Sequence, residues 1–282
     1  MVIDCHVHLT APTLLSHYDR IAAEEPYFKL LSESSVNRFA TAEDALRYMD
    51  ANQIDQAVVF GFAFQNQKYL DAANEYIIEA VQKHPDRFIG FGVVNPNLPN
   101  LADKIRSLAE NGMIGIGELF PTGQNFALGD YTTMKPLADA CMEHNLVLSI
   151  HANEPVGHDY PGKTATGLLE LQQFAEHFPE LAIIYCHFGG GLAFYEMMPE
   201  MQKILQNVRY DTAAAKYLYT KQIYPAFKSM QRIDKLLFGS DYPLPCAPAV
   251  LADIRASDMD PADKDKVLGQ NLIHLLSKRG QA

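Results

Sequence analysis

Two histidines separated by one residue stand at the end of the first apolar segment, in Asp4-Cys5-His6-Val7-His8. Side chains alternate across a strand, so His6 and His8 point to the same side. Neutral imidazole is a common nitrogen ligand of zinc and related divalent ions, and two imidazoles on rigid backbone suit such an ion. The same spacing also fits two structural histidines, so the motif alone leaves both interpretations open.

Further residues with metal-binding or acid–base chemistry occur at the ends of later apolar segments: Glu118 in 114–120, His151 after 146–150, His187 after 182–186, Asp211 after 207–210 and Asp241 after 236–240. The other six of the ten histidines include five in or near helical stretches: His17, His84, His144, His177 and His274. Several imidazoles together with carboxylates are typical of a hydrolytic metal site.

The segments that must position these residues alternate between two patterns. Short apolar runs typical of buried parallel strands occupy 2–6, 56–61, 88–93, 114–120, 146–151, 182–187, 207–211 and 236–241. Amphipathic stretches typical of helices occupy 41–52, 67–84, 99–111, 131–144, 165–178, 191–206, 216–231, 247–257 and 261–278. Thr41 with Asp44, and Thr164, fit helix caps, and Pro261 fits a first helical turn.

This alternation predicts an α/β fold: a (β/α)8 TIM barrel in which residues 1–282 form one domain. A doubly wound open sheet is the alternative, but no Gly-x-Gly-x-x-Gly follows the first strand. In a barrel the carboxyl ends of the strands share one face, so the candidate residues would ring one pocket. Residues 10–40 interrupt the repeat, and we expect a helical insertion that forms a lid over that face.

Composition limits the classes of function. The formal net charge is −11, which argues against nucleic acid and anionic membrane surfaces as partners. No apolar run approaches the roughly 20 residues of a membrane helix, and no signal peptide is evident at the start. The four cysteines form no C-x-x-C pair, which favours a reducing, cytoplasmic location. We expect a small-molecule substrate and, because dimers are the commonest assembly, a homodimer.

The motifs resemble those of the amidohydrolase superfamily, and within it the amidohydrolase-related group that includes aminocarboxymuconate-semialdehyde decarboxylase. The matching features are Asp4-x-His6-x-His8, His151, His187-Phe188-Gly189-Gly190 and Gly239-Ser240-Asp241-Tyr242-Pro243, in order along the whole chain. The resemblance implies that His6, His8, His151 and Asp241 bind a divalent metal. It also implies that His187 is a further ligand or an acid/base, and that Asp241 accepts a proton from metal-bound water.

Glu118 bears on the number of ions. Relatives with two metals often carry a bridging carboxylated lysine on the fourth strand, and residues 114–120 contain no lysine. Glu118 would therefore either bridge two ions or hydrogen-bond a ligand histidine. We expect zinc, with manganese as the alternative, as one tightly bound ion with room for a weaker second.

Residues 153–163 after the fifth strand are polar and rich in proline and glycine, and loops on this face of a barrel carry specificity. Lys163 is a candidate to bind a substrate carboxylate, with His158 and Tyr160 as hydrogen-bonding partners; an exposed connector is the alternative. Gly189–Gly191 weakly suggests an anion site. A set of phenylalanines suggests an aromatic pocket: Phe60, Phe62, Phe64, Phe120 and Phe126.

The main hypothesis is a metal-dependent hydrolase that uses metal-activated water on an ester, lactone or amide. The alternative is a non-oxidative decarboxylase of an aromatic or dienoic acid, in which His187 would protonate the carbon. A decarboxylase would need a cation near the site, and Arg20 and Lys163 are the candidates. A non-catalytic barrel that only binds metal or ligand is less well supported, because Asp241 would then have no role.

Overall fold

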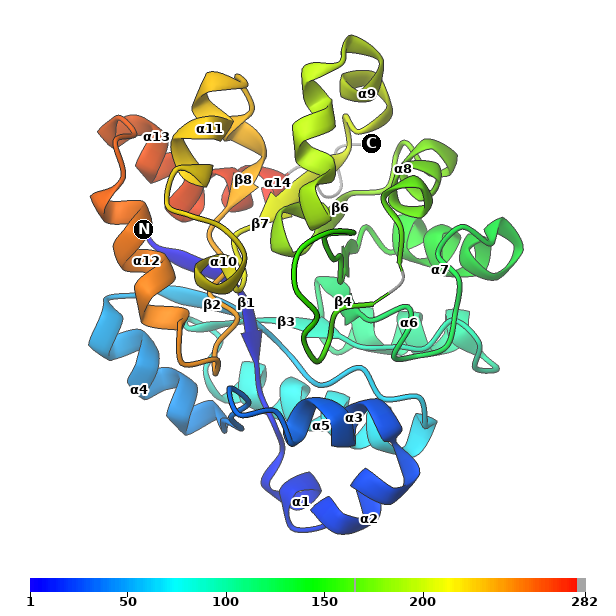
Figure 1. The fold of residues 1–282 in the computed structure, drawn as a ribbon. Helices are drawn as coiled ribbons and strands as arrows, with labels where there is room; N and C mark the ends of the chain where they lie inside the picture. Colours follow the sequence, from blue (N-terminus) through cyan, green and yellow to red (C-terminus); the bar gives the residue numbers. More distant parts are fainter. Residues whose placement is uncertain (165, 278–282) are drawn as a thin grey trace.

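The computed structural model describes residues 1–164 and 166–277. Its eight strands are all parallel and follow one another round a nearly closed barrel, as the sequence predicted (Figure 1). The strands are β1 (Ile3–His8), β2 (Gln56–Phe60), β3 (Phe88–Gly92), β4 (Gly115–Leu119), β5 (Val147–Ile150), β6 (Ile183–Tyr185), β7 (Val208–Asp211) and β8 (Leu236–Leu237). Their side chains are almost all buried, as expected for strands enclosed by a ring of helices.

The helices surround these strands (Figure 1). They are α1 (Pro12–Leu15), α2 (Tyr18–Glu24), α3 (Pro26–Ser32), α4 (Ala42–Asn52), α5 (Gln67–Lys83), α6 (Leu101–Glu110), α7 (Tyr131–Glu143), α8 (Leu168–His177), η1 (His187–Met197), α9 (Pro199–Ile204), α10 (Ala215–Leu218), α11 (Ile223–Ser229), η2 (Ile233–Lys235), α12 (Ala247–Ala256), α13 (Pro261–Asp265), η3 (Lys266–Gln270) and α14 (Asn271–Ser277). No helix in the described residues is long and apolar enough to cross a membrane.

Local sequence explains where several helices begin. Thr41 and Asp44 form the predicted capping box at the start of α4, and Pro261 stands in the first turn of α13. The Thr164 cap was wrong: α8 starts after Gly167, and the Thr164 hydroxyl instead donates to Asn153. Residue 165, where one predicted helix begins, and residue 278, where another ends, lie outside the described part of the chain.

Three predicted helices are divided in the structure. The stretch 191–206 splits into η1 and α9, because Pro199 starts a new helix and the glycines before it have left-handed backbone. The stretch 216–231 splits into α10 and α11, and 261–278 into α13, η3 and α14. A loop over 219–222 separates α10 from α11, whereas α13, η3 and α14 follow one another directly and Gly269 of η3 departs from helical backbone.

The barrel closes where β1 meets the chain that follows β8. The Cys5 N–H donates to the Phe238 carbonyl at 2.8 Å, and the Asp241 N–H donates to the His6 carbonyl at 3.1 Å. The His8 N–H completes the series by donating to the Tyr242 carbonyl at 2.8 Å. We call this contact between residues 4–8 and 238–242 the seam. It places the first and last motifs of the sequence side by side.

The insertion at 10–40 is helical, as predicted, and consists of α1, α2, α3 and a connecting segment that leads to α4. Figure 1 shows these three helices at one side of the barrel, next to α5. Glu25 fastens the insertion to the loop after β2, because its buried carboxylate accepts the backbone N–H groups of Gln65 and Asn66 at 2.9 and 2.8 Å. Phe28 of α3 packs against Phe62 and Phe64 of the same loop.

Candidate metal centre

Three candidate ligands meet at the seam. The Nε2 atoms of His6 and His8, on β1, lie 3.2 Å apart. The Oδ1 atom of Asp241 lies 3.6 Å from Nε2 of His6 and 3.4 Å from Nε2 of His8. His6 is fully buried and Asp241 is nearly so, whereas His8 is partly exposed. The alternation expected for β1 therefore does bring His6 and His8 together, and the seam adds a carboxylate.

Glu118 of β4 lies between this group and two more histidines. Its Oε2 atom is 3.6 Å from Nε2 of His6 and 3.7 Å from Nε2 of His8. Its Oε1 atom is 3.0 Å from Nδ1 of His151 and 3.4 Å from Nε2 of His187. One carboxylate thus faces both pairs of imidazoles, which is compatible with either role predicted for Glu118.

His151 and His187 follow β5 and β6, and Nδ1 of His151 lies 3.1 Å from Nε2 of His187. Nδ1 of His187 lies 3.1 Å from the Ala213 carbonyl, which can only accept, so Nδ1 carries the proton and Nε2 faces the cluster. Nε2 of His151 lies 3.3 Å from the Gly162 carbonyl in the loop after β5. That contact directs Nδ1 of His151 toward Glu118.

The residues fit a divalent metal ion. Three groups have ligand atoms within 4.8 Å of one another, and two of them contain only imidazoles and the carboxylates of the cluster: His6, His8 and Asp241, and His6, Glu118 and His187. The third group is His6, Cys186 and Asp211. Nitrogen and carboxylate donors in this mixture suit zinc or manganese. Among the described residues, Glu118 and Asp241 form ion pairs with histidines alone, and none with lysine or arginine. These buried carboxylates therefore lie where a cation would be stabilised.

The electrostatics of the cluster are dominated by burial and by neighbouring charge. Burial alone would lower the pKa of His6, but Glu118, Asp211 and Asp241 outweigh it and raise that pKa to about 10. The same balance, with Glu118 as the main partner, raises the pKa of His187 to about 9. For Asp241 burial opposes ionisation, yet His6, His8 and His187 bring its pKa down to about 2.

Asp211, at the end of β7, orients two members of the cluster. Its Oδ2 atom lies 2.9 Å from Nδ1 of His6, and its Oδ1 atom accepts the backbone N–H of His187 at 2.7 Å. A carboxylate on Nδ1 fixes the tautomer of His6 and leaves Nε2 for a ligand role. The sequence placed Asp211 at a strand end but assigned it no role. The signal that could have found it was its strand-end position, shared with His151 and Asp241.

Backbone conformation at the site is unusual. His187 has φ 55° and Asp241 has φ 62°, in the left-handed region that non-glycine residues seldom adopt. Left-handed residues cluster at functional sites, where the surrounding structure holds them in place. Gly190 allows close packing here, because a Cβ atom on it would lie 2.1 Å from the Asn153 carbonyl oxygen. These turns direct His187 and Asp241 toward the strand ends.

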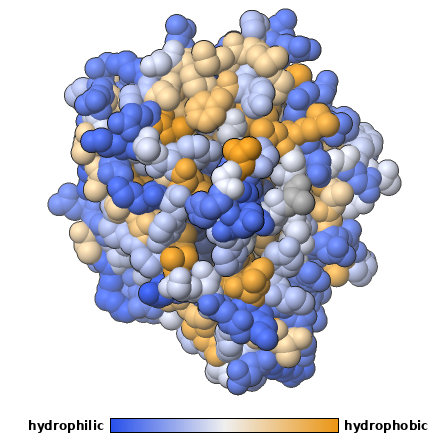
Figure 2. Space-filling view, viewed as in Figure 1, coloured by the Kyte–Doolittle hydropathy of each residue, from blue (hydrophilic) through white to orange (hydrophobic). Residues whose placement is uncertain are grey.

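A cavity of about 450 Å³ opens beside the cluster, and His8, Glu118, His151, His187 and Asp241 form part of its wall. The rest of its wall comes from the insertion and from loops after the strands. Figure 2 shows a hollow near the middle of this face, with apolar and polar side chains around it. The insertion thus contributes to the wall of the cavity that contains the cluster, on the face where a lid was predicted.

The cavity is partly aromatic. Its aromatic side chains are Phe28, Phe39, Phe62, Phe120, Tyr160 and Tyr217. Of the predicted set, Phe62 and Phe120 line it, and the Phe60 ring instead packs 5.0 Å from the ring of His6. Phe64 and Phe126 belong to the hydrophobic core. The prediction of an aromatic pocket is therefore confirmed, but only two of the five predicted phenylalanines line it.

Arg38 supplies a cation to this cavity from the end of the insertion. Its side chain is exposed, and its Nη1 atom donates to the carbonyls of Ser35 and Asn37. Across the opening, burial raises the pKa of Tyr217, while the charge of Arg38 acts to lower it and that of Asp241 to raise it. Tyr217 therefore lies within electrostatic reach of both the arginine and the candidate ligand Asp241.

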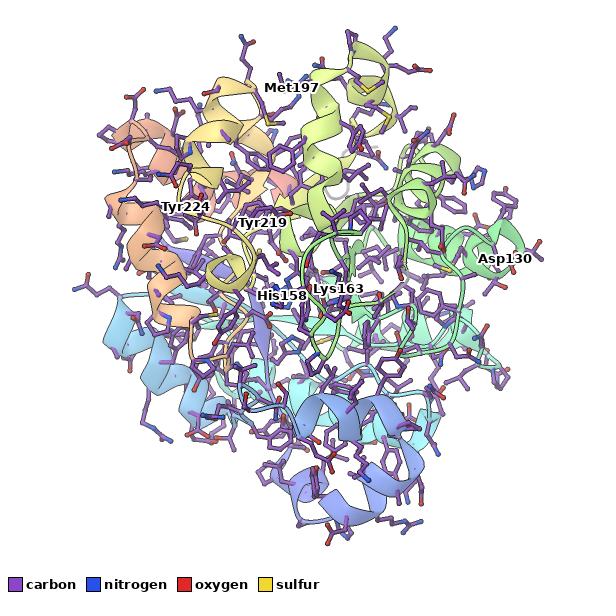
Figure 3. The ribbon with its side chains drawn as sticks, viewed as in Figure 1. Asp130, His158, Lys163, Met197, Tyr219 and Tyr224 are labelled. Carbon is purple, nitrogen blue, oxygen red and sulfur yellow. The ribbon has the colours of Figure 1, made fainter. Side chains whose placement is uncertain are left out.

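The other predicted substrate-binding residues lie on the loop after β5. His158 and Tyr160 line the cavity. Lys163 does not: its Nζ donates to the carbonyls of Val156, Gly157 and His158 at 2.8, 3.2 and 3.0 Å, which uses all three N–H groups. Figure 3 shows His158 and Lys163 next to each other on this loop. Arg20 pairs with Glu24 on the exposed face of α2, away from the cavity.

The metal site can be tested by removing two imidazoles. We expect His6→Ala combined with His8→Ala to abolish most metal binding, because both Nε2 atoms point into the cluster. His274→Ala removes an exposed histidine of α14 and serves as the matched control. Metal per chain is measured by plasma mass spectrometry and folding by circular dichroism. A folded double variant that retains all of its metal would contradict the site.

The pKa of His6 predicts a pH dependence for the metal-free protein. A raised pKa means that protonation stabilises the folded state, and this contribution is complete below 6.5 and lost as pH rises through about 10. The midpoint of thermal unfolding of the chelator-treated protein should therefore fall between pH 7 and 10. With metal bound, the ligand imidazole has no such proton to lose, so the decrease should be smaller. Equal decreases in both forms would contradict this.

Comparison with known proteins agrees with the fold and the motifs. The sequence profile of the amidohydrolase family matches residues 3–276. A 2-amino-3-carboxymuconate-6-semialdehyde decarboxylase from Dictyostelium discoideum is 22% identical over 253 residues, which cover 78% of this chain and 70% of the relative.

Two solved structures illustrate the range of similar folds. The manganese-bound 5-carboxyvanillate decarboxylase of Novosphingobium aromaticivorans is 20% identical, with a TM-score of 0.78 over 98% of this chain and 96% of its own. The 4-oxalomesaconate hydratase of Rhodopseudomonas palustris is also 20% identical, with a TM-score of 0.72 over 99% and 96%. The profile match over nearly the whole chain, on a barrel whose strand ends carry the motif residues, shows that this chain belongs to the amidohydrolase family.

Proposed function

We propose that this chain is a metal-dependent decarboxylase that releases CO2 from a small aromatic or dienoic acid. The observation that carries the proposal is the composition of the cavity: aromatic side chains surround it, the histidine–carboxylate cluster forms part of its wall and Arg38 lies at its opening. An acid with a flat apolar body fits such a cavity. The decarboxylases similar to this chain support the same choice.

In this proposal His6, His8 and Asp241 hold one divalent ion, with Glu118, His151 and His187 close to it. Zinc is the expected ion, and manganese, which the similar carboxyvanillate decarboxylase binds, is the alternative. A bound ion would supply positive charge to the substrate carboxylate or a neighbouring oxygen. Because Glu118 faces both histidine pairs, two metals per chain would make it a bridge, whereas one would leave it as a hydrogen-bonding partner of His151.

In this reaction the protein side chains supply the proton that replaces the carboxyl group. When the bond between the substrate carbon and its carboxyl group breaks, CO2 leaves and the electron pair remains on that carbon, which then takes a proton. His187 would donate it from Nε2: the Ala213 carbonyl accepts from Nδ1, and, against the effect of burial, Glu118 is the main group that raises the pKa to about 9, which leaves a second proton on Nε2, beside the cavity. Asp241 lines the same cavity. Its carboxylate would accept a proton from water and pass it to the site, which replaces the proton that the substrate carbon has taken.

Hydrolysis is the second candidate, and the position of Asp241 favours it. This carboxylate lines the cavity, lies 3.4 Å from His8 and stays ionised, since its pKa is lowered to about 2. A carboxylate so placed accepts a proton from an attacking water. We rank hydrolysis lower because the named relative is a decarboxylase and because an acidic substrate gives Arg38 a role.

The two candidates are separated by their products. Metal-loaded protein is incubated with hydroxylated benzoic acids and dienoic acids, and with ester, lactone and amide substrates, while CO2 and hydrolysis products are measured. We expect CO2 from an acid. We also expect Asp241→Asn, whose amide oxygen can still act as a weaker ligand, to retain metal when metal is in excess yet lose turnover. Hydrolysis without CO2 release would replace the proposal, and turnover by Asp241→Asn would remove Asp241 from proton transfer.

Arg38 gives a test of substrate charge. We expect Arg38→Met to raise KM for the acid substrate by about tenfold or more, because a hydrogen bond to a charged group contributes about 1.5–3 kcal/mol. Arg20→Met is the matched control, since Arg20 belongs to the same insertion but pairs with Glu24 outside the cavity. Steady-state kinetics measure both. Equal KM values for Arg38→Met and the unmodified chain would show that Arg38 does not bind the substrate.

A further inference from the structure

The first and last motifs contain residues that the proposed chemistry leaves without a role. Asp4 stands two residues before His6, and Ser240 directly precedes Asp241. Both side chains are fully buried, at 0% exposure. A buried carboxylate is costly unless hydrogen bonds compensate it, so its partners indicate what it does.

The Asp4 carboxylate bonds across the seam. Its Oδ1 atom accepts the Ser240 backbone N–H at 2.9 Å and the His6 backbone N–H at 3.2 Å. Its Oδ2 atom accepts the Tyr48 hydroxyl of α4 at 3.4 Å. The Oγ atom of Ser240 in turn accepts the Tyr242 backbone N–H at 3.0 Å. The contacts of Asp4 thus join a ligand on one side of the seam to the neighbour of a ligand on the other.

These contacts fill a gap in the backbone hydrogen bonding of the seam. The N–H groups of Cys5, His8 and Asp241 donate to carbonyls of the opposite side, whereas the Ser240 N–H donates to the Asp4 side chain. The left-handed conformation of Asp241 follows directly after Ser240. The stacked rings of Tyr48 and Tyr242, 4.2 Å apart, enclose the same region. Asp4 therefore fixes the chain at the point where it turns to present Asp241.

We infer that Asp4 is a positioning residue for the metal centre: its carboxylate sets the placement of Asp241 relative to His6 and thereby the affinity for metal. The inference rests on the proposed metal site. It does not depend on which reaction the site performs. Asp4 acts through the backbone N–H groups of Ser240 and His6, so the contact requires an acceptor oxygen at the position of Oδ1.

The test compares two variants of Asp4 with a control. Asp4→Ala removes both acceptors, while Asp4→Asn keeps an oxygen that can face the two N–H groups. Glu25→Ala is the control, because Glu25 is also a buried carboxylate that accepts two backbone N–H groups. Glu25 belongs to the insertion and not to the seam. Metal affinity is measured by competition with a chromophoric chelator well below the unfolding temperature of every variant, and stability by chemical denaturation.

We expect Asp4→Ala to weaken metal binding by about 10- to 100-fold, the usual effect of removing a group that orients a ligand. Asp4→Asn should retain more of the affinity, and Glu25→Ala should lose stability without losing affinity. Unchanged affinity in Asp4→Ala, or an equal loss in Glu25→Ala, would overturn the inference. If Asp4→Ala does not fold, the comparison of Asp4→Asn with Glu25→Ala decides.

Hydrogen exchange separates this inference from the proposed function. In metal-free protein, Asp4→Asn or Asp4→Ala should speed amide exchange in peptides that span 238–242 and leave those that contain Gln65 and Asn66 unchanged. Unchanged exchange at 238–242 would contradict the role of Asp4 at the seam. An unmodified chain that binds no metal would overturn the proposed function and the effect of Asp4 on affinity, while faster exchange would still establish the structural contact.

Discussion

The burial of carboxylates and imidazoles against one another is the interaction on which the site depends. Asp211, Glu118 and Asp241 surround His6, and none of these four groups can ionise at low cost in an apolar interior. Each carboxylate stabilises positive charge on the histidine, and the histidine stabilises negative charge on the carboxylates. A divalent cation would satisfy the same carboxylates more fully than a proton on His6 can, so the cluster is organised for a cation.

The barrel holds these groups in place. Parallel strands place their carboxyl ends on one face, so the candidate ligands lie on the strands or directly after them, and Asp241 is held in the turn after β8 by the seam. The loops then have a separate task. The insertion and the loops after β2, β4, β5 and β7 supply the aromatic rings of the cavity, and the insertion also supplies Arg38. Because most of the wall comes from loops and the insertion, the same fold can carry different substrate cavities beside one centre.

Much of this could be predicted from the sequence, because strong periodic patterns carried it. The apolar runs predicted all eight strands, and their ends marked six residues that the fold does bring together: His6, His8, Glu118, His151, His187 and Asp241. The predicted strand 236–241 is too long, because β8 ends at Leu237 and Asp241 lies in the turn after it. Lys163 was chosen for its charge alone, and only the structure shows its ammonium bound to loop carbonyls. Arg38 and Asp211 went unassigned because their roles depend on contacts between distant segments. The homodimer and the cytoplasmic location stay predictions.

The seam has a consequence for how this chain is made. Asp4 and Ser240 are 236 residues apart, so their contact cannot form until the segment that contains Ser240 has left the ribosome. Contacts between such distant residues close late and slow folding. His6 and His8 are synthesised long before Asp241, because more than two hundred residues separate them along the chain. A partly synthesised chain would therefore have two candidate ligand histidines but no complete centre, and tight metal binding would require a closed barrel.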